Sequence, residues 1–311
     1  MKRVLITGAS GFIGRSLSIE LLNRGYIVTA LMRKKSNLLP VDVNQIIVCD
    51  FNYKIDYSLI FKDIDCLIHL AGRAHIVDES VKFNLAKFRE INTCLTLKLA
   101  KKAAEFGVGR FLFLSSIGVN GNQNNKPFSE TDIPNPQDSY AISKYEAEKG
   151  LFRISEDTQL KIVIIRPPLV YGANAPGNFG RLVDFFSAEF LLPLPFGAVN
   201  NKRSLVAIDN LVDFIITCMV HKNAENEVFL ISDNKDVSTM QLLNKMAKAF
   251  DRRLVLLPIP IKFMILLAGL IGKKKDAIRL FSSLQVDISK AQKNLNWQPK
   301  VTMDEQLSKI S

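Results

Sequence analysis

The sequence contains few residues of the kinds that bind metals or form disulfides. Of its 311 residues, only four are cysteines and three are histidines. They are Cys49, Cys66, Cys94 and Cys218, and His69, His75 and His221. No two cysteines form a CxxC pair and three lie in apolar runs, so we expect buried free thiols in a reducing compartment. The histidines lack the spacing of metal ligands, so we expect no metal site.

Long hydrophobic runs are also absent. The apolar run near the start covers only Val4 to Ile6, which is too short for a signal peptide, so we expect a cytoplasmic protein. The run from Phe263 to Gly272, followed by Lys273, Lys274 and Lys275, is too short to span a bilayer. We favour a packed helix for this run, with peripheral membrane contact as the alternative.

The net charge of +11 is the main anomaly of the composition. Its basic residues are scattered and form no stripe interleaved with aromatic residues, so we expect no nucleic-acid partner. A basic surface also attracts polyanionic small molecules or the face of an anionic membrane. These two kinds of partner remain open on charge alone.

Short apolar runs alternate with helical patterns through the first half of the chain. The predicted strands are Arg3–Thr7, Ile27–Met32, Gln45–Cys49, Cys66–Leu70, Arg110–Ser115 and Lys161–Arg166. The predicted helices include Phe12–Asn23 and Phe83–Phe106. Continuous apolar strands that alternate with helices predict a Rossmann-type α/β fold, a doubly wound parallel sheet.

The composition changes near Arg166, where proline and glycine become frequent. We therefore predict a dinucleotide-binding domain over residues 1–171 and a smaller sugar-nucleotide-binding lobe over residues 172–311. We expect the segment of about 204–235 to return to the first domain. Ligands of such folds bind at the carboxyl ends of the strands.

The segment "TGASGFIG" follows the first predicted strand and begins the first predicted helix. In it, Gly8 permits a tight turn, Gly11 lets the backbone approach a pyrophosphate, and Gly14 allows close packing of helix on strand. The helix N-terminus adds amide donors. This context predicts a dinucleotide-binding loop.

The residue at the end of the second predicted strand indicates whether the cofactor ribose carries a free 2′-hydroxyl or a 2′-phosphate. An acidic residue there would bind a free 2′-hydroxyl, but the chain has Met32 followed by Arg33 and two lysines. We therefore expect NADP(H), with NAD(H) as the alternative if Arg33 belongs to a solvated basic loop. Asp50 either meets the adenine amino group or simply begins a loop.

The segment "YAISK" places Tyr140 and Lys144 four residues apart, on one face of a helix. The charge of Lys144 would lower the pKa of the Tyr140 phenol and suit it to acid–base work. Ser116, at the end of a predicted strand, could hydrogen-bond the substrate oxygen that Tyr140 protonates.

With these motifs in place, nearly the whole chain resembles the extended short-chain dehydrogenase/reductase family of nucleotide-sugar epimerases, dehydratases and reductases. The resemblance rests on "TGASGFIG", "DCLIHLAG", "SSIGVNG", "YAISK", "RPPLVYG", "KRSLVAIDNLVD" and "DISKAQKNLNWQPKVTMDEQL". It implies that Tyr140 is the acid/base, that Lys144 tunes its pKa and contacts the ribose, and that Ser116 binds the substrate oxygen. Ser115 is the neighbouring alternative to Ser116.

The resemblance also assigns the other binding residues. It implies substrate contacts for Ser115 and Asn178, and a grip on the sugar-nucleotide diphosphate for Arg203 and Arg279. It assigns a structural role to His69. The expected cofactor-binding residues are Gly8, Gly11, Phe12, Ile13, Gly14, Arg33, Asp50, Phe51, Leu70, Ala71, Gly72, Asn92, Lys144 and Pro167.

Departures from the family patterns narrow the expected reaction. Ile117 and Gly118 replace the Asp-Glu pair of sugar 4,6-dehydratases, and Asn120 replaces the tyrosine of many 4-epimerases. The pattern is similar to reductases of UDP-4-keto-6-deoxy-N-acetylglucosamine, which serve bacterial surface polysaccharide. We therefore expect a 4-ketoreductase of a UDP-(N-acetyl)-6-deoxyhexose. The alternatives are a UDP-hexose 4-epimerase with tightly bound NAD and, more distantly, a dinucleotide-sensing protein without catalysis. Family members often dimerise through the helices carrying Asn92 and Tyr140, so we expect a homodimer.

Overall fold

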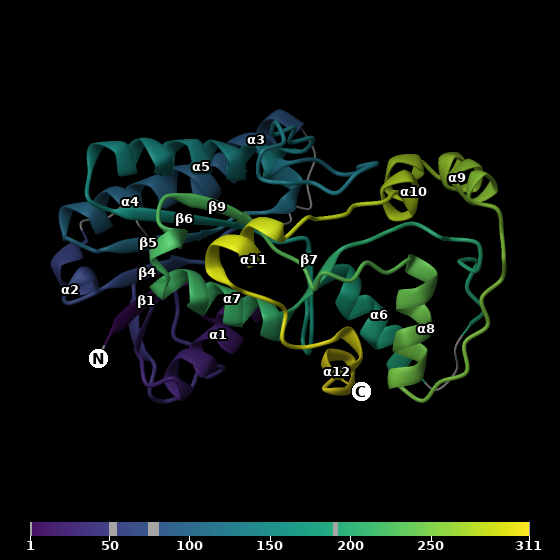
Figure 1. Cartoon of the computed structure of the whole chain (residues 1–311), viewed down its shortest axis with the longest axis horizontal. Coiled ribbons are helices and arrows are strands. Elements are labelled where there is room, and N and C mark those ends of the chain that lie inside the picture. Colours follow the sequence, from purple (N-terminus) through teal and green to yellow (C-terminus); the bar gives the residue numbers. More distant parts are fainter. Residues whose placement is uncertain (1, 50–54, 74–80, 189–191, 311) are drawn as a thin grey trace.

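The computed structural model describes residues 2–49, 55–73, 81–188 and 192–310, and only the backbone of residues 81–84 and 275. A seven-stranded sheet forms the larger lobe (Figure 1), and all its strands pair in parallel. In spatial order the strands are β3 (Asn44–Ile47), β2 (Ile27–Met32), β1 (Arg3–Thr7), β4 (Cys66–His69), β5 (Arg110–Leu114), β6 (Lys161–Arg166) and β9 (Glu227–Leu230). The predicted fold class is confirmed.

Helices cover both faces of this sheet, as the continuous apolar strands require. In β1, Val4 and Ile6 pack into one core cluster and Leu5 into the other, because successive side chains of a strand point to opposite faces. The first cluster lies against α1 (Phe12–Asn23), α7 (Ile208–Val220) and α11 (Ser289–Leu295). The second lies against α2 (Tyr57–Phe61), α4 (Leu95–Glu105) and α5 (Ser139–Asp157).

The predicted long helix over Phe83–Phe106 is three consecutive pieces. These are α3 (Val81–Phe88), a π-helical turn over Arg89–Cys94, and α4. The turn buries Asn92, and such π-bulges are frequent at functional sites.

The smaller lobe, which Figure 1 shows beside the sheet, is built around a third cluster of buried apolar side chains. It contains the parallel pair β7 (Leu169–Tyr171) and β8 (Leu205–Ala207). Its helices are α6 (Gly177–Ser187), α8 (Thr239–Ala249), α9 (Ile261–Leu270), α10 (Lys274–Phe281) and α12 (Met303–Ser308). The segment after β8 returns to the sheet through α7 and β9, which pairs with β6.

The expectation of buried thiols holds for half of the cysteines. Cys66 and Cys218 are buried, whereas Cys49 and Cys94 are exposed, and all four are free. Cys49 follows the edge strand β3, which has a neighbour on one side only, and Cys94 lies on the outer side of the π-helical turn. Among the described residues, no helix is long and apolar enough to cross a membrane.

Candidate active site

The glycine loop joins β1 to α1 at the carboxyl edge of the sheet. Gly8 has φ +74°, and a Cβ there would lie 2.7 Å from the Ala71 nitrogen. At Gly14 a Cβ would lie 2.2 Å from the Gly8 carbonyl oxygen. Gly11 is the N-cap of α1, and its amide donates to the Gly8 carbonyl at 3.0 Å. Only glycine fits at Gly8 and Gly14, and the loop leaves the N-terminus of α1 open to an anion. A dinucleotide pyrophosphate fits this cradle.

β1 lies between β2 and β4, so the loop sits where the chain winding reverses, at the switch point of the sheet. Three of the expected cofactor residues meet beside it. A Cβ on Gly72 would lie 3.2 Å from Lys144 Nζ and 3.3 Å from Asn92 Oδ1. Asn92 accepts a hydrogen bond from the Arg73 amide at 2.8 Å and donates to Ser143 Oγ at 3.1 Å. The buried amide thus ties the strand end after β4 to α5.

A buried chain of hydrogen bonds supports the strand ends below the loop. His69 Nδ1 lies 2.7 Å from Thr7 Oγ1, and His69 Nε2 lies 2.9 Å from Thr96 Oγ1. Thr96 donates its proton to the Asn92 carbonyl at 2.8 Å, so it accepts from His69 Nε2–H, and Nδ1 accepts from Thr7. Burial lowers the pKa of His69 to about 3, with a smaller effect from the Lys144 charge. His69 is therefore neutral and structural, as the family resemblance implies.

Tyr140 and Lys144 lie on the first turns of α5, whose N-cap Asp138 accepts from the Ala141 amide at 2.8 Å. The Tyr140 ring meets Phe88 edge-on, with centroids 6.1 Å apart. Lys144 Nζ donates to the Leu114 carbonyl at 2.8 Å and lies 6.0 Å from the Tyr140 ring centroid. The two groups share one side of the helix, as the spacing predicts.

The predicted lowering of the Tyr140 pKa is wrong for the protein alone. Burial, and to a smaller extent the Asp138 charge, raise the pKa of Tyr140 to about 12. Burial also lowers the pKa of Lys144 to about 7, although the Glu148 carboxylate opposes this shift. Lys144 is thus only partly charged near neutral pH, which weakens its pull on the phenolate. Desolvation outweighs the cation here.

The two serines after β5 have different surroundings. Ser116 begins a 3-10 turn over Ile117–Val119 and accepts from the Gly118 amide at 3.1 Å, which leaves its hydroxyl proton available to a ligand. Ser115 is buried and donates to Glu148 instead. The structure therefore does not support the substrate contact expected of Ser115.

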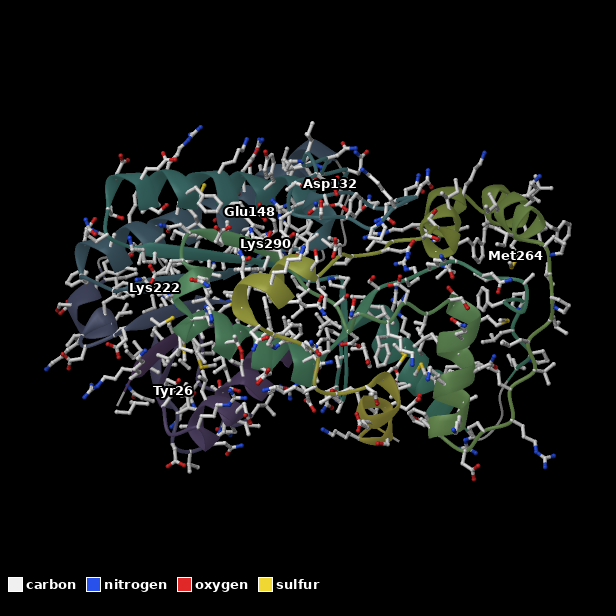
Figure 2. The ribbon with its side chains drawn as sticks, viewed as in Figure 1. Tyr26, Asp132, Glu148, Lys222, Met264 and Lys290 are labelled. Carbon is white, nitrogen blue, oxygen red and sulfur yellow. The ribbon has the colours of Figure 1, made fainter. Side chains whose placement is uncertain are left out.

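Glu148 anchors a buried network beneath Ser116 and points from α5 toward the sheet (Figure 2). Arg166 donates to both of its carboxylate oxygens, from Nε at 3.0 Å and from Nη2 at 2.5 Å. Arg166 also donates to Asn120 Oδ1 at 2.9 Å, and Asn120 donates to the Ser129 carbonyl at 3.1 Å. Each of the three guanidinium nitrogens of Arg166 thus makes one hydrogen bond, and this buried ion pair holds the loop that carries Ser116 in place.

The predicted diphosphate residues Arg203 and Arg279 lie together in the smaller lobe. Arg203 Nη1 donates to the carbonyls of Arg279 at 3.1 Å and Ser282 at 3.2 Å. Burial and the neighbouring charge of Arg279 lower the pKa of Arg203. Arg279 Nη1 reaches Asp138 Oδ2 at 3.9 Å, across to the N-cap of α5. A diphosphate bound between these two arginines would offset the repulsion between their charges.

The remaining predicted residues border the same edge. Arg33 and Asn178 are exposed, at the end of β2 and in the first turn of α6 respectively. Phe12 and Ile13 are half-buried in the first turn of α1, and Leu70 and Ala71 follow β4 beside Gly8. Pro167 follows β6, and its carbonyl accepts from the Ile117 amide at 2.9 Å. The predicted contacts of Asp50 and Phe51 lie outside the described residues.

Sequence reasoning missed two charged residues at this site. Arg15 directly follows Gly14, and its buried Nε has no hydrogen-bond partner among the described residues. The sequence could have indicated Arg15, because a basic residue in the first turn of a phosphate-binding helix lies close to the bound anion. Asp138 links α5 to Arg279, but it is visible only once the two lobes are brought together.

The arrangement can move one proton at a substrate hydroxyl. Tyr140 would hold that proton, Ser116 would orient the oxygen, and Lys144 would contact the ribose. A bound oxidised nicotinamide would supply a hydride acceptor and a positive charge that lowers the pKa of a nearby phenol. Ile117 and Gly118, which follow Ser116, carry no group that can give or take a proton.

Comparison with known proteins agrees with this geometry. Residues 4–232 match the NAD dependent epimerase/dehydratase family. A UDP-glucose 4-epimerase from Vibrio cholerae is 42% identical over 308 residues, covering 98% of this chain and 93% of that protein. A dTDP-4-dehydro-6-deoxyglucose reductase from Escherichia coli is 25% identical, and the match covers 99% of this chain and 96% of that protein.

The solved structures agree as well. The crystal structure of UDP-glucose 4-epimerase from Thermotoga maritima, with UDP-glucose, has a TM-score of 0.76 at 25% identity and covers 99% of this chain and 96% of that one. Motifs, site and fold therefore lead to one conclusion: the chain belongs to the NAD dependent epimerase/dehydratase family.

Proposed function

We propose that this enzyme is a UDP-sugar 4-epimerase that works with a bound NAD. The observation that carries the proposal is the position of Tyr140, Lys144 and Ser116 beside the glycine loop, with Ile117 and Gly118 where a dehydratase carries acids. Such a site suits oxidation and re-reduction at one carbon. The 42% identity to a UDP-glucose 4-epimerase along almost the whole chain supports the same reaction.

In this proposal the reaction is redox-neutral. A hydride leaves C4 of the hexose and returns to the opposite face of the same carbon, while Tyr140 takes and restores the proton of the 4-hydroxyl. Ser116 orients that oxygen. Arg203 and Arg279 grip the diphosphate, which leaves the sugar room to present either face.

The second candidate is the 4-ketoreductase that consumes NADPH, which the sequence patterns favour. Two observations favour it: the exposed Arg33 follows Met32 where a carboxylate would bind a ribose 2′-hydroxyl, and one relative is a 4-keto-sugar reductase. In that case the product would be a UDP-6-deoxyhexose for surface polysaccharide.

One experiment separates the two candidates. The purified enzyme is denatured to identify any bound dinucleotide by mass, and the native enzyme is incubated with UDP-glucose and UDP-N-acetylglucosamine without added cofactor. The proposal expects bound NAD and a C4 epimer in the NMR spectrum. A protein free of NAD that converts only UDP-4-keto sugars, with one NADPH consumed per product, would establish the reductase instead.

The Arg33→Ala variant tests the source of the cofactor preference. If NAD is the cofactor, the variant binds it as the wild type does, because Arg33 has no phosphate to contact. If NADPH is the cofactor, the variant loses roughly ten- to a hundredfold in NADPH affinity, the worth of a charged hydrogen bond. Isothermal titration of both dinucleotides reads out the difference.

A further inference from the structure

Helix α9 presents a row of large apolar side chains to solvent. Phe263, Leu266, Leu267 and Leu270 are 46–78% exposed, and Ile271, at the end of the helix, is 74% exposed. The first four lie three or four residues apart, so they cover an arc of about 100° on one side of the helix. A globular helix normally turns charged residues toward solvent on this side.

The opposite side of α9 accounts for its own packing. Met264 is buried, and Ile261, Ile265 and Ala268 are half-buried, so this side faces the lobe, as Figure 2 shows for Met264. The helix is therefore apolar on both sides, and the residues that the structure describes cover only one of them. The α9 stripe, as we call Phe263, Leu266, Leu267, Leu270 and Ile271, is not needed to hold the helix in place.

Positive charge surrounds the stripe. Residues 252–286 contain seven basic residues and a single acidic one, Asp276. Lys262 precedes the stripe, and Lys273 and Lys274 follow it, all of them exposed. Apolar side chains flanked by lysines are suited to an anionic bilayer. The apolar side chains can insert among the acyl chains, and the lysines are attracted by the anionic headgroups.

We propose that α9 docks this enzyme on anionic phospholipid membranes, lying in the plane of the headgroups with its stripe inserted. Ten residues are too few to span a bilayer, so the helix lies on one surface. Figure 1 places α9 and α10 side by side at the end of the smaller lobe far from the N-terminus. That position lets the helix reach a flat surface.

The docked helix is connected to the candidate substrate site. α9 packs on α10, and α10 carries Arg279, whose carbonyl accepts from Arg203. The substrate-binding lobe would thus face the bilayer, while the Rossmann lobe extends away from it. The proposal does not depend on which reaction the site performs.

Vesicle flotation tests the proposal with the full-length enzyme. The wild type should float with vesicles containing about 30% phosphatidylglycerol and remain behind with pure phosphatidylcholine or at high salt, which screens the lysines. Leu266→Glu combined with Leu270→Glu should lower the bound fraction at least about tenfold. Ile133→Glu, which changes an 89% exposed side chain in another region, should float as the wild type does.

Insertion itself can be followed by fluorescence. Trp297 is the single tryptophan and is buried, so a Phe263→Trp variant adds a reporter at the stripe. Brominated lipids should quench the new emission and leave that of Trp297 unchanged. Retained turnover and an unchanged Tm confirm that the charged variants are folded.

Three outcomes would overturn the proposal. The wild type could fail to float on either kind of vesicle, or the double variant could float as well as the wild type. Alternatively, sedimentation could show that the wild type is a dimer and that the double variant is a monomer. This result would assign the stripe to a contact with a second copy of the chain.

Discussion

Tyr140 is the residue on which the proposed chemistry depends most directly. Its pKa of about 12 in the protein alone means that the phenol keeps its proton until a positive charge arrives. The nearby Lys144, with a pKa of about 7, does not supply a full charge. The sequence spacing located this pair but could not reveal the sign of the shift, because burial depends on Phe88 from another helix.

Tyr140→Phe should lower kcat by roughly 10²–10⁴-fold, the usual contribution of a positioned acid–base group. Cofactor affinity should stay within about twofold, since only the hydroxyl is lost. Tyr145→Phe, one turn further along α5, is the matched control and should retain activity. A Tyr140→Phe enzyme with more than about a tenth of wild-type kcat would refute the assigned role.

His69 makes a pH-dependent contribution to stability. Its pKa is about 3 when folded against 6.5 ordinarily, so between these values the unfolded chain binds the extra proton. Stability therefore falls as the pH drops below about 6.5, by up to about 1.4 kcal/mol per pH unit from this residue. His69→Gln should remove about 2 kcal/mol of the stability difference between about pH 7 and about pH 5.

Urea unfolding at both pH values measures the His69 effect. The matched control is His221→Gln, because His221 is half-buried and its ring caps a short turn through the Asn223 amide. If the free energy of unfolding changes equally with pH in the wild type and in the His69→Gln variant, His69 in the Thr7–His69–Thr96 chain does not cause the pH dependence.

At the scale of elements, β1, the glycine loop and α1 form a unit that tolerates no side chain at Gly14. A Cβ there would lie 2.2 Å from one backbone oxygen and 2.6 Å from the Ala9 Cα. Gly14→Ala should push α1 off the strand, weaken NAD binding by more than about a hundredfold and lower Tm. Gly109→Ala is the control, because its nearest atom, an Asp65 oxygen, lies 3.5 Å away. Wild-type dinucleotide affinity in Gly14→Ala, measured by calorimetry, would contradict this view of the loop.

The loop at Arg203 and helix α10 form the proposed diphosphate site. Arg203→Ala should raise the KM for the sugar nucleotide about ten- to a hundredfold, because the diphosphate would lose a half-buried cationic partner. The Kd for NAD should not change. Arg252→Ala, which removes an exposed arginine of the same lobe, is the control. If KM stays constant in Arg203→Ala, the side chain serves only to tether α10.

The sequence predicted best the elements that have a continuous apolar run or a regular helical pattern. The bounds of β1, β2, β6 and α1 agree with the structure, because apolar runs and nearby glycines or prolines define them locally. The π-helical turn at Asn92 was not predictable, since it depends on hydrogen bonds to Arg73 and Ser143. The buried role of Ser115 depends likewise on Glu148, 33 positions away.

At the scale of the whole molecule, the larger lobe presents the glycine loop and Tyr140, and the smaller lobe presents Arg203 and Arg279. The weak contact between Arg279 and Asp138 joins them beside Tyr140. The domain boundary near residue 171 and the homodimer stay predictions. The change in composition near Arg166 predicts two lobes, but it gives no information on the contact between Arg279 and Asp138.

The fate of the hydrogen at C4 tests the central claim most directly. UDP-glucose deuterated at C4 is given to the enzyme with no added cofactor, and the product is examined by NMR and mass spectrometry. The account predicts a 4-epimer that retains the deuterium at C4, because the same hydride leaves and returns within one active site. The Tyr140→Phe variant should form none of this product. A 4-epimer that carries solvent hydrogen at C4, or no epimer beside a functioning NADPH-dependent keto reduction, would contradict the account.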